Sequence, residues 1–236
     1  TLASLRKVMR EDNVSIAVNA PVATKPEQVI SINRKMAAHN SKPENHDVIC
    51  LGSMHPFFAR CGNIREEIEF LAAAGIKGIK MHTEYQDFFP DDGRLKIIYE
   101  SCARNSLFIL FHAGVDLAYD SDDVRGTPAR FKAVLDVTGL KVILAHMGGY
   151  RVWDEVYRQL RGRAVYFDTA FTAEMEDTQF KGIIEAHGPD KILFGSDFPW
   201  ARPSGIIGKI NKLFLDEAVR ERILQNNAAA LLGIKL

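Results

Sequence analysis

Five apolar runs in this chain end on a side chain that can bind a metal ion or carry a proton. The runs are IKGIKMH, LFILFH, KVILAH, AVYFD and KILFGSD, and their last residues are His82, His112, His146, Asp168 and Asp197. A β-strand that is buried on both faces has a continuous apolar sequence, as in parallel sheets. Because parallel strands end at a common edge, these five side chains are predicted to share one rim of the sheet.

The order of elements predicts the kind of sheet. Short strands rich in Val, Ile, Leu and Phe alternate with stretches of helical period. We expect helices near residues 2–12, 26–39, 63–74, 94–105, 128–138, 150–161, 173–187, 205–214 and 216–232. This alternation predicts an α/β fold with a parallel sheet, of the (β/α)8 TIM barrel type.

The first strand of that barrel is missing from the expected series. We count seven strands, and they end near Asn19, Ser53, His82, His112, His146, Asp168 and Asp197. A parallel barrel closes with eight strands, and this chain begins on a helix. We therefore expect strand one on an upstream segment of roughly 30 residues, the usual size of one βα unit. Residues 1–236 are interpreted as a single, N-terminally incomplete barrel domain.

Composition narrows the class of protein. The 30 basic residues balance the 30 acidic ones, which gives no indication of a nucleic-acid or anionic-membrane partner. No apolar stretch approaches the roughly 18 residues of a membrane span. Three cysteines without a CxxC pair argue against a disulfide framework. We expect a cytoplasmic protein, and the sequence leaves a homo-oligomer open.

Two histidines and one aspartate are the best candidates for a metal site. His112 in FHAG and His146 in AHMGG each precede glycine, which lets the backbone turn and a ligand approach. Asp197 in GSDFPW offers a carboxylate that can bind a divalent ion and accept a proton. Neighbouring strands are only about 5 Å apart, so the three are predicted to form one metal or catalytic site. The alternatives are hydrogen-bonded structural histidines and an Asp197 that caps the next helix.

Residues on and just after the strand that ends at His82 are candidates for substrate binding. Lys80 and His82 are two positions apart and project to the same side. Lys80 would hold an anionic substrate or, if carbamylated, bridge two metals; alternatively, its stem packs and its ammonium reaches solvent. Tyr85 and Gln86 lie on the long loop that follows, where binding residues concentrate. Trp200 either walls the pocket or simply packs.

The remaining histidines and Asp168 receive weaker assignments. His55, which precedes a proline, is expected to be structural. Asp168 either orients a metal-binding histidine or satisfies buried backbone donors. His39, His46 and His187 lie in polar or helix-terminal stretches and are predicted to be surface residues.

The ordered motifs KGIKMHTEYQ, FHAG, ILAHMGG, YFDTA and FGSDFPW resemble the amidohydrolase superfamily. The similar branch is the amidohydrolase-related one that includes aminocarboxymuconate-semialdehyde decarboxylase-like enzymes, and the resemblance covers most of the chain from about residue 14. It implies a metal-dependent (β/α)8 barrel in which His112 matches the strand-five ligand, His146 the strand-six histidine and Asp197 the strand-eight aspartate. The family's first strand carries a His-x-His metal pair, and no His-x-His occurs in this sequence.

The resemblance implies a hydrolase of an amide, ester or lactone. A single divalent ion, with Zn²⁺ expected, would activate water, Asp197 would carry the proton, and His146 would ligate the ion or polarise the substrate. The alternative is nonoxidative decarboxylation of an unsaturated or aromatic carboxylic acid anchored on Lys80. Both hypotheses take a small molecule, and a carboxylate-bearing one suits Lys80. A third hypothesis is a non-catalytic binding module, because the metal pair is absent.

Overall fold

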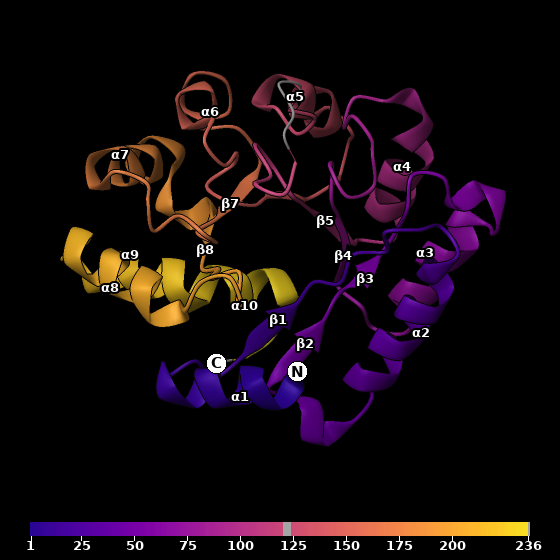
Figure 1. The fold of residues 1–236 in the computed structure, drawn as a ribbon, viewed down its shortest axis with the longest axis horizontal. Helices are drawn as coiled ribbons and strands as arrows, with labels where there is room; N and C mark the ends of the chain where they lie inside the picture. The colour runs from indigo at the N-terminus through magenta and orange to yellow at the C-terminus, as the bar shows by residue number, and fades with distance from the viewer. Residues whose placement is uncertain (120–123, 236) are drawn as a thin grey trace.

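Parallel β-strands surrounded by helices form the centre of the computed structural model, which describes residues 1–119 and 124–235 (Figure 1). One sheet joins β1 (Ala17–Asn19) to β2 (Val48–Cys50). The other has the order β3 (Gly52–Ser53), β4 (Gly78–Met81), β5 (Phe108–Phe111), β6 (Val142–Leu144), β7 (Tyr166–Asp168) and β8 (Ile192–Leu193). Every pairing is parallel, which confirms the predicted α/β class.

The strands β2 and β3 form one run that is interrupted only at Leu51, so the observed strands correspond to the seven predicted ones. The Leu51 N–H donates to the Asn19 carbonyl of β1, which continues the pairing across the interruption. Within the described ranges, no ladder joins β1 to β8. The upstream strand that would lie between them stays a prediction.

Each predicted helix is present, although several begin later or end earlier than expected. The helices are α1 (Leu2–Glu11), α2 (Gln28–Asn40), α3 (Ile64–Ala73), α4 (Lys96–Arg104), α5 (Pro128–Leu135), α6 (Trp153–Gln159), α7 (Asp177–His187), α8 (Pro203–Leu213), α9 (Glu217–Glu221) and α10 (Asn227–Leu232). A π-helical segment, Arg222–Asn226, joins α9 to α10 where the sequence predicts one continuous helix.

Side chains of the strands alternate between two apolar cores. Those that face the helices include Ile79, Ile109 and Phe167. Those that face inward form a smaller interior cluster, which consists of Leu51, Phe108, Ile143 and Leu193 together with Leu232 of α10. In Figure 1, α10 lies between β8 and β1, next to this interior. The alternation fixes which residues at the strand ends point into the barrel.

The first residue of α10 covers the outer edge of β8. The Leu193 carbonyl accepts from Thr169 N–H at 3.0 Å and therefore faces β7, so the peptide groups of Ile192 face the opposite edge. There the Asn227 amide donates to the carbonyls of Ile192 and Pro189, each at 2.8 Å. An unpaired strand edge invites pairing with other chains, and Asn227 blocks part of it.

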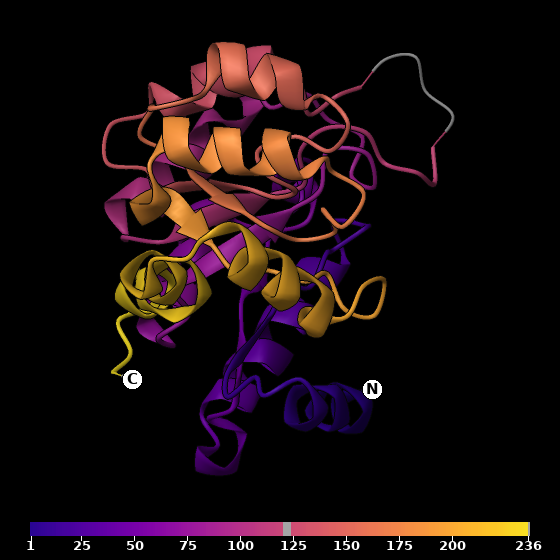
Figure 2. The same ribbon diagram turned by 90° about the vertical axis from the view of Figure 1, so that its left-hand side faces the viewer.

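Helix α1 is bound to the start of α8 by ion pairs. The Arg202 guanidinium donates to Asp12 at 2.5 Å and to Glu11 at 3.0 Å, and Asp12 also accepts from Ser204 N–H at 2.9 Å. In the side view, α1 and β1 extend below the body formed by the larger sheet and its helices (Figure 2). The contact thus joins parts that are distant in sequence and that no strand pairing connects within the described residues.

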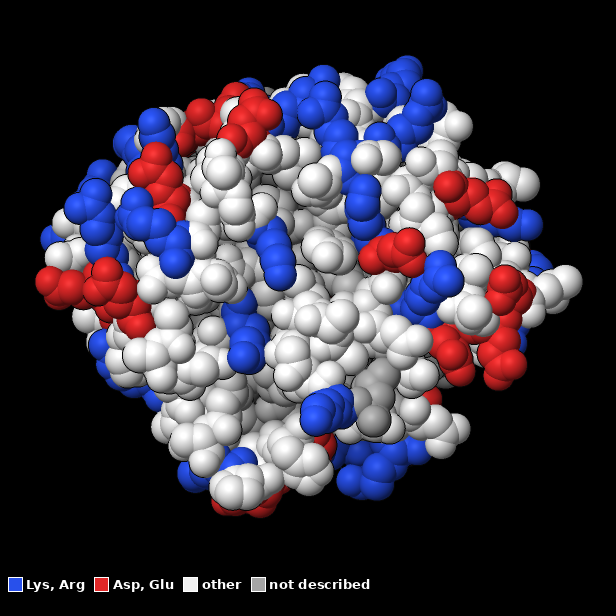
Figure 3. All heavy atoms as spheres, turned by 180° about the vertical axis from the view of Figure 1, so that it is seen from behind, with Lys and Arg blue, Asp and Glu red and all other residues white. Residues whose placement is uncertain are grey.

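Charged side chains of both signs occupy the face seen from behind, with Asp and Glu mainly toward its edge (Figure 3). None of the helices in residues 1–119 and 124–235 combines the length and apolarity that crossing a membrane requires. The expectations of cytoplasmic location and of no nucleic-acid partner stay predictions.

Candidate metal centre

The carboxyl ends of the strands bring His112 and His146 into direct contact, with ring nitrogens 3.1 Å apart. Among the described residues, the group of potential metal ligands within 4.8 Å of one another is His82, His112 and Asp116, so the predicted joint site of His112, His146 and Asp197 stays a prediction.

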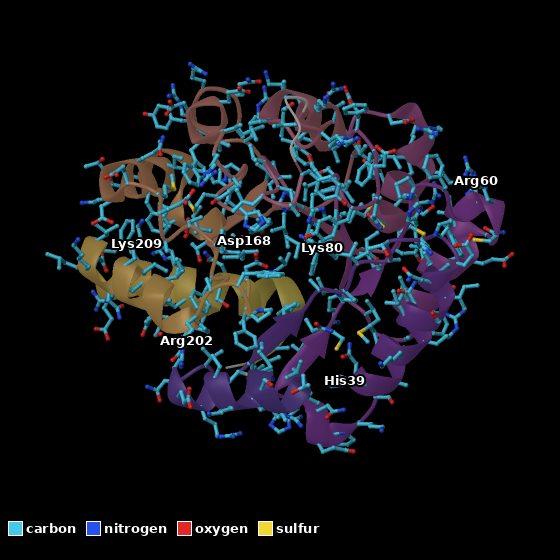
Figure 4. All side chains as sticks on the ribbon, in the orientation of Figure 1. His39, Arg60, Lys80, Asp168, Arg202 and Lys209 are labelled. Atoms are coloured by element: carbon cyan, nitrogen blue, oxygen red, sulfur yellow. The ribbon has the colours of Figure 1, made fainter. Side chains whose placement is uncertain are left out.

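Ile79 and Met81 face the helices, so Lys80 and His82 face inward by alternation. Figure 4 shows Lys80 and Asp168 near the centre of the ring of strands, whereas the labelled Arg60 and Arg202 lie at the periphery.

The two histidines after β5 and β6 form a hydrogen-bonded pair with a defined proton direction. His146 Nδ1 lies 2.9 Å from the Ala170 carbonyl, which only accepts, so Nδ1 carries the proton. In the neutral ring, Nε2 is then an acceptor, and it lies 3.1 Å from His112 Nδ1. His112 therefore donates from Nδ1, and its Nε2 carries a lone pair.

Within residues 1–119 and 124–235, that lone pair on His112 has no hydrogen-bond partner, although the atom is buried. His112 is only 6% exposed, and burial, with the neighbouring His82 and His146, holds its pKa well below the usual value. A buried nitrogen without a partner is rare, and metal-binding histidines characteristically hydrogen-bond through the other ring nitrogen. The arrangement fits a divalent ion on His112 Nε2. His146, with both nitrogens engaged, supports this ligand and would have to release it to bind the ion itself.

Asp168 positions His146 through the backbone. Its Oδ1 accepts from the N–H groups of His146 at 2.9 Å and Ala170 at 3.0 Å. Of the two roles that the sequence left open for Asp168, the structure shows the satisfaction of backbone donors. His146 and Met147 have φ values of 61° and 56°, which non-glycine residues rarely adopt. Such conformations persist where surrounding contacts impose them, as Asp168 does here.

Asp197 lies at the mouth of the barrel; the residue as a whole is exposed, but its neighbours shield the carboxyl group from part of the water. Its φ of 66° is also in the left-handed region. Within the described part of the chain, its carboxylate makes no hydrogen bond that would hold it as a helix cap. Loss of surrounding water raises the pKa of Asp197, while His146 and Lys80 act against this rise. The carboxylate is therefore available to a ligand.

Lys80 points into the barrel and is 9% exposed, and burial lowers its pKa against the opposing charges of Asp168 and Asp197. This inward position contradicts the alternative in which its stem packs between strand and helix. An ammonium with two carboxylates near it and little water around it can attract an anionic group.

His82 lies in an aromatic stack and contacts a carboxylate from the next loop. Its ring is parallel to Tyr85 at 3.8 Å and to His112 at 4.1 Å. Nδ1 accepts from Tyr85 N–H at 3.3 Å, and Nε2 lies 3.3 Å from Asp116 Oδ2. Burial lowers the pKa of His82 to about 4, so at neutral pH this contact joins a neutral imidazole to a carboxylate.

Gln86 fixes the loop that carries this stack. Its amide nitrogen donates to the carbonyls of Ala23 and Met54, each at 2.8 Å, and its oxygen accepts from His82 N–H at 2.8 Å. Gln86 is 2% exposed. These backbone bonds link three strand ends and leave Gln86 a structural role instead of the predicted substrate contact. Tyr85 and Trp200, in contrast, are 38% and 74% exposed and remain accessible.

Two further histidines are buried. His55 accepts from Phe57 N–H at 3.1 Å through Nδ1, as its expected structural role requires. His187 was predicted at the surface, and this prediction is wrong, because it is 3% exposed and stacks on Phe167 at 4.0 Å. Its position at the end of an amphipathic helix places it on the face that packs against β7.

Sequence reasoning missed Asp116. One potential ligand atom from each of His82, His112 and Asp116 lies within 4.8 Å of the others. Asp116 follows His112 by four residues in FHAGVD, so a carboxylate soon after a strand-end histidine was the available indication. Hydrogen bonds from His82 and from Ala118 N–H outweigh the effect of burial and lower the pKa of Asp116.

The chain belongs to the amidohydrolase family, whose model (Amidohydro_2) matches residues 56–234. The match covers most of the chain, includes all five strand-end residues, and confirms the resemblance seen in the motifs. A comparison with curated proteins finds no match.

Solved structures confirm the barrel fold. A TIM-barrel protein from Bordetella bronchiseptica, Bb4693, is 19% identical with a TM-score of 0.77, and covers 99% of this chain and 83% of its own. The 5-carboxyvanillate decarboxylase LigW from Sphingomonas paucimobilis is 17% identical with a TM-score of 0.78, covering 100% and 84%. The decarboxylase LigW2 from Novosphingobium aromaticivorans, solved with bound manganese, is 12% identical with a TM-score of 0.75, covering 98% and 80%.

Proposed function

We propose that the protein is a metal-dependent hydrolase that cleaves an amide, ester or lactone of a small, carboxylate-bearing molecule. The observation that carries the proposal is the proton direction in the histidine pair. Within the described residues, it leaves the buried Nε2 of His112 without a hydrogen-bond partner, and the carboxylate of Asp197 also accepts no hydrogen bond there.

The residues present fit a divalent ion. His112 Nε2 and the carboxylate of Asp197 are donors of the kinds that Zn²⁺ binds at catalytic sites, and Zn²⁺ is our expected ion. When bound, such an ion polarises a substrate oxygen and makes a water molecule more acidic.

Side chains of the protein transfer the proton, hold the metal-binding histidine in place and bind the substrate. Asp197 accepts a proton from water on its free carboxylate and returns it to the leaving group. His146 holds the His112 ring in place through Nε2 and is itself held by Ala170 and Asp168. A substrate carboxylate binds to Lys80, and the exposed rings of Tyr85 and Trp200 cover the rest of the molecule.

Decarboxylation of an aromatic or unsaturated acid is a second candidate. The specific observation in its favour is Lys80, a buried cation that can hold a carboxylate beside His82 and Tyr85. Two of the similar structures described above carry the name 5-carboxyvanillate decarboxylase. In this reaction, Asp197 would deliver a proton to the carbon that loses CO₂.

A substrate screen with metal-stripped and Zn²⁺- or Mn²⁺-reloaded protein tests both candidates. Small lactones and esters are followed by acid release, and aromatic acids by CO₂ release. We expect metal-dependent hydrolysis, a fall in kcat of about 10²–10⁴-fold in Asp197→Asn, and a raised KM for carboxylate-bearing substrates in Lys80→Met. The exposed His46→Gln serves as a control with unchanged kinetics.

The outcomes separate the hypotheses. Release of CO₂ without hydrolysis would favour the second candidate. Activity that is indifferent to metal, or to Asp197→Asn, would contradict the proposal. Tight binding of a small acid without any turnover would support a non-catalytic binding module.

A further inference from the structure

A groove on the outside of the barrel lies between α7 and the segment that joins α8 to α9. Its volume is about 560 Å³. Figure 2, in which this side faces the viewer, shows α7 above α8. One of its lining residues, Pro189, directly precedes β8, so the groove lies at the amino ends of the strands, opposite the mouth that carries the candidate metal centre. The apolar side chains that line it are Ile184, Pro189, Leu213, Phe214, Leu215 and Val219.

Leu215 projects from the rim of this groove and is held in that position. It is 87% exposed, whereas the adjacent Phe214 is 7% exposed. Arg220 donates to the carbonyl of Phe214 at 2.8 Å and to that of Leu215 at 2.6 Å. On the other side, Asp216 begins α9 by accepting from Ala218 N–H at 2.9 Å. These bonds fix the turn, so the exposure of Leu215 does not come from a loose loop.

We propose that Leu215 and the groove form the interface of a symmetric dimer, in which Leu215 of each protomer lies in the groove of the other. A two-fold axis brings the same surface of two chains together, so the projecting group and its receptor must lie on one face. The exposed Leu215 and the apolar groove meet this requirement. Transfer of leucine from water to apolar surroundings is favourable, and homodimer interfaces are more apolar than the rest of a protein surface.

The charged residues of the groove suit a two-fold contact. Lys181 and Glu185, one turn apart on α7, belong to one wall, and Lys212 and Asp216 belong to the other. Each wall therefore carries one positive and one negative group. A two-fold axis through the groove reverses the order of these charges in the partner, so the lysines of one copy face acidic groups of the other.

A second copy is the occupant that these observations favour. A small ligand in the groove would leave Leu215 at its rim in water, whereas a second protein surface covers both. The chain has 30 basic and 30 acidic residues, so two copies carry no net charge that would drive them apart. A lone exposed leucine is ordinary, but one that is continuous with an apolar groove marks an interaction site.

Analytical ultracentrifugation of the whole chain over a wide concentration range tests the inference. We expect a monomer–dimer equilibrium for the wild type. Leu215→Asp should weaken dimerisation more than about 30-fold, the effect of losing an interface hot spot, because it places a charge against apolar side chains. The matched control is Leu117→Asp, at a leucine that is 57% exposed beside the mouth, and it should change the dissociation constant less than about threefold.

Charge exchange on α7 tests how the two copies are oriented. Lys181→Glu should weaken dimerisation by about 3–10-fold, because it places like charges opposite each other, and the addition of Glu185→Lys should restore it. The exposed Lys35→Glu on α2 changes the net charge equally and should have no such effect. Failure of the double exchange to restore dimerisation would overturn the two-fold arrangement.

Hydrogen exchange locates the contact in the wild type without relying on a variant. Amides of residues 213–219 should exchange more slowly at concentrations where the dimer forms. The inference is overturned if the wild type remains a monomer, if Leu215→Asp dimerises as the wild type does, or if Leu117→Asp dissociates the dimer equally. A monomer whose groove binds an apolar dye would assign the groove to a small ligand and also overturn it. Because Leu215 is exposed, Leu215→Asp should keep the urea midpoint of the wild type, which verifies that it is folded.

Discussion

His187 should make the fold sensitive to mild acid. At the end of α7, its Nδ1 accepts from Gly162 N–H at 3.1 Å, and its Nε2 donates to the Val165 carbonyl at 2.8 Å. The buried ring is therefore neutral, with its proton on Nε2. A second proton on Nδ1 would face the Gly162 N–H. Burial accordingly lowers the pKa of His187 from 6.5 to about 4.

The sign of the effect follows from proton uptake. Between pH 6.5 and about 4, the unfolded chain binds a proton at His187 and the folded chain does not, so stability falls as the pH falls. At about 1.36 kcal/mol per pH unit, the gap between the two pKa values corresponds to roughly 3 kcal/mol of unfolding free energy. Above pH 6.5 this contribution is fully present.

The perturbation is His187→Gln, which retains a donor and an acceptor but cannot titrate. Urea unfolding of both proteins at pH 7.5 and 4.5 gives the stability difference at each pH. We expect the advantage of the wild type to shrink by roughly 2–3 kcal/mol at pH 4.5, or to reverse. Other buried histidines, such as His82, titrate in both proteins and cancel in the comparison.

The exposed His46 provides the matched control. His46→Gln should change stability by less than about 0.5 kcal/mol at both pH values, because it contacts only its own turn. If the stability difference between the wild type and His187→Gln is the same at pH 7.5 and 4.5, the assignment of a buried, neutral His187 is refuted.

Four other substitutions test the fold in thermal or urea unfolding. Gly114→Ala should lower the free energy of unfolding by more than about 2 kcal/mol, because φ is +85° and a Cβ would lie 2.1 Å from Tyr150 N. At Gly208 in α8, an added Cβ meets nothing, so Gly208→Ala should raise the free energy of unfolding by about 0.5–1 kcal/mol. Equal effects of the two substitutions would contradict this reasoning. Gln86→Leu should cost about 2–4 kcal/mol, since it leaves three buried backbone groups unpaired, and a cost below about 1 kcal/mol would show that they find other partners. Asn227→Ala should cost about 1–2 kcal/mol and increase self-association in sedimentation; unchanged association would mean that Asn227 does not protect the β8 edge.

Most of the fold could be predicted because the strands are buried on both faces. Continuous apolar runs such as the one ending at His112 have few alternatives to a parallel strand, and the polar residue that ends each run marks the rim. The same rule placed Lys80 and His82 on one side. The interruption at Leu51 and the π-helical segment before α10 were not predicted, because a pattern of apolar residues does not show where the backbone hydrogen bonds are interrupted or shifted.

The sequence predicted which residue types form the site, but it did not predict the hydrogen bonds between them or all of their neighbours in space. His112 and His146 were identified as neighbours, yet which nitrogen carries the proton depends on the Ala170 carbonyl, a backbone group that no motif reveals. Asp116 lies on a loop, where spacing along the chain says little about distance in space. His187 was misplaced because a polar residue at a helix end is usually exposed, and only the packing against Phe167 shows otherwise.

The position of Leu232 in the interior cluster has a consequence for biosynthesis. This side chain, from near the end of the sequence, seals a space whose other walls, such as Leu51, are translated much earlier. The interior apolar cluster of the barrel is complete only after α10 has emerged from the ribosome. Until then, the apolar side chains of Leu51, Phe108, Ile143 and Leu193 lack their contact with Leu232, so this part of the core is completed late in translation.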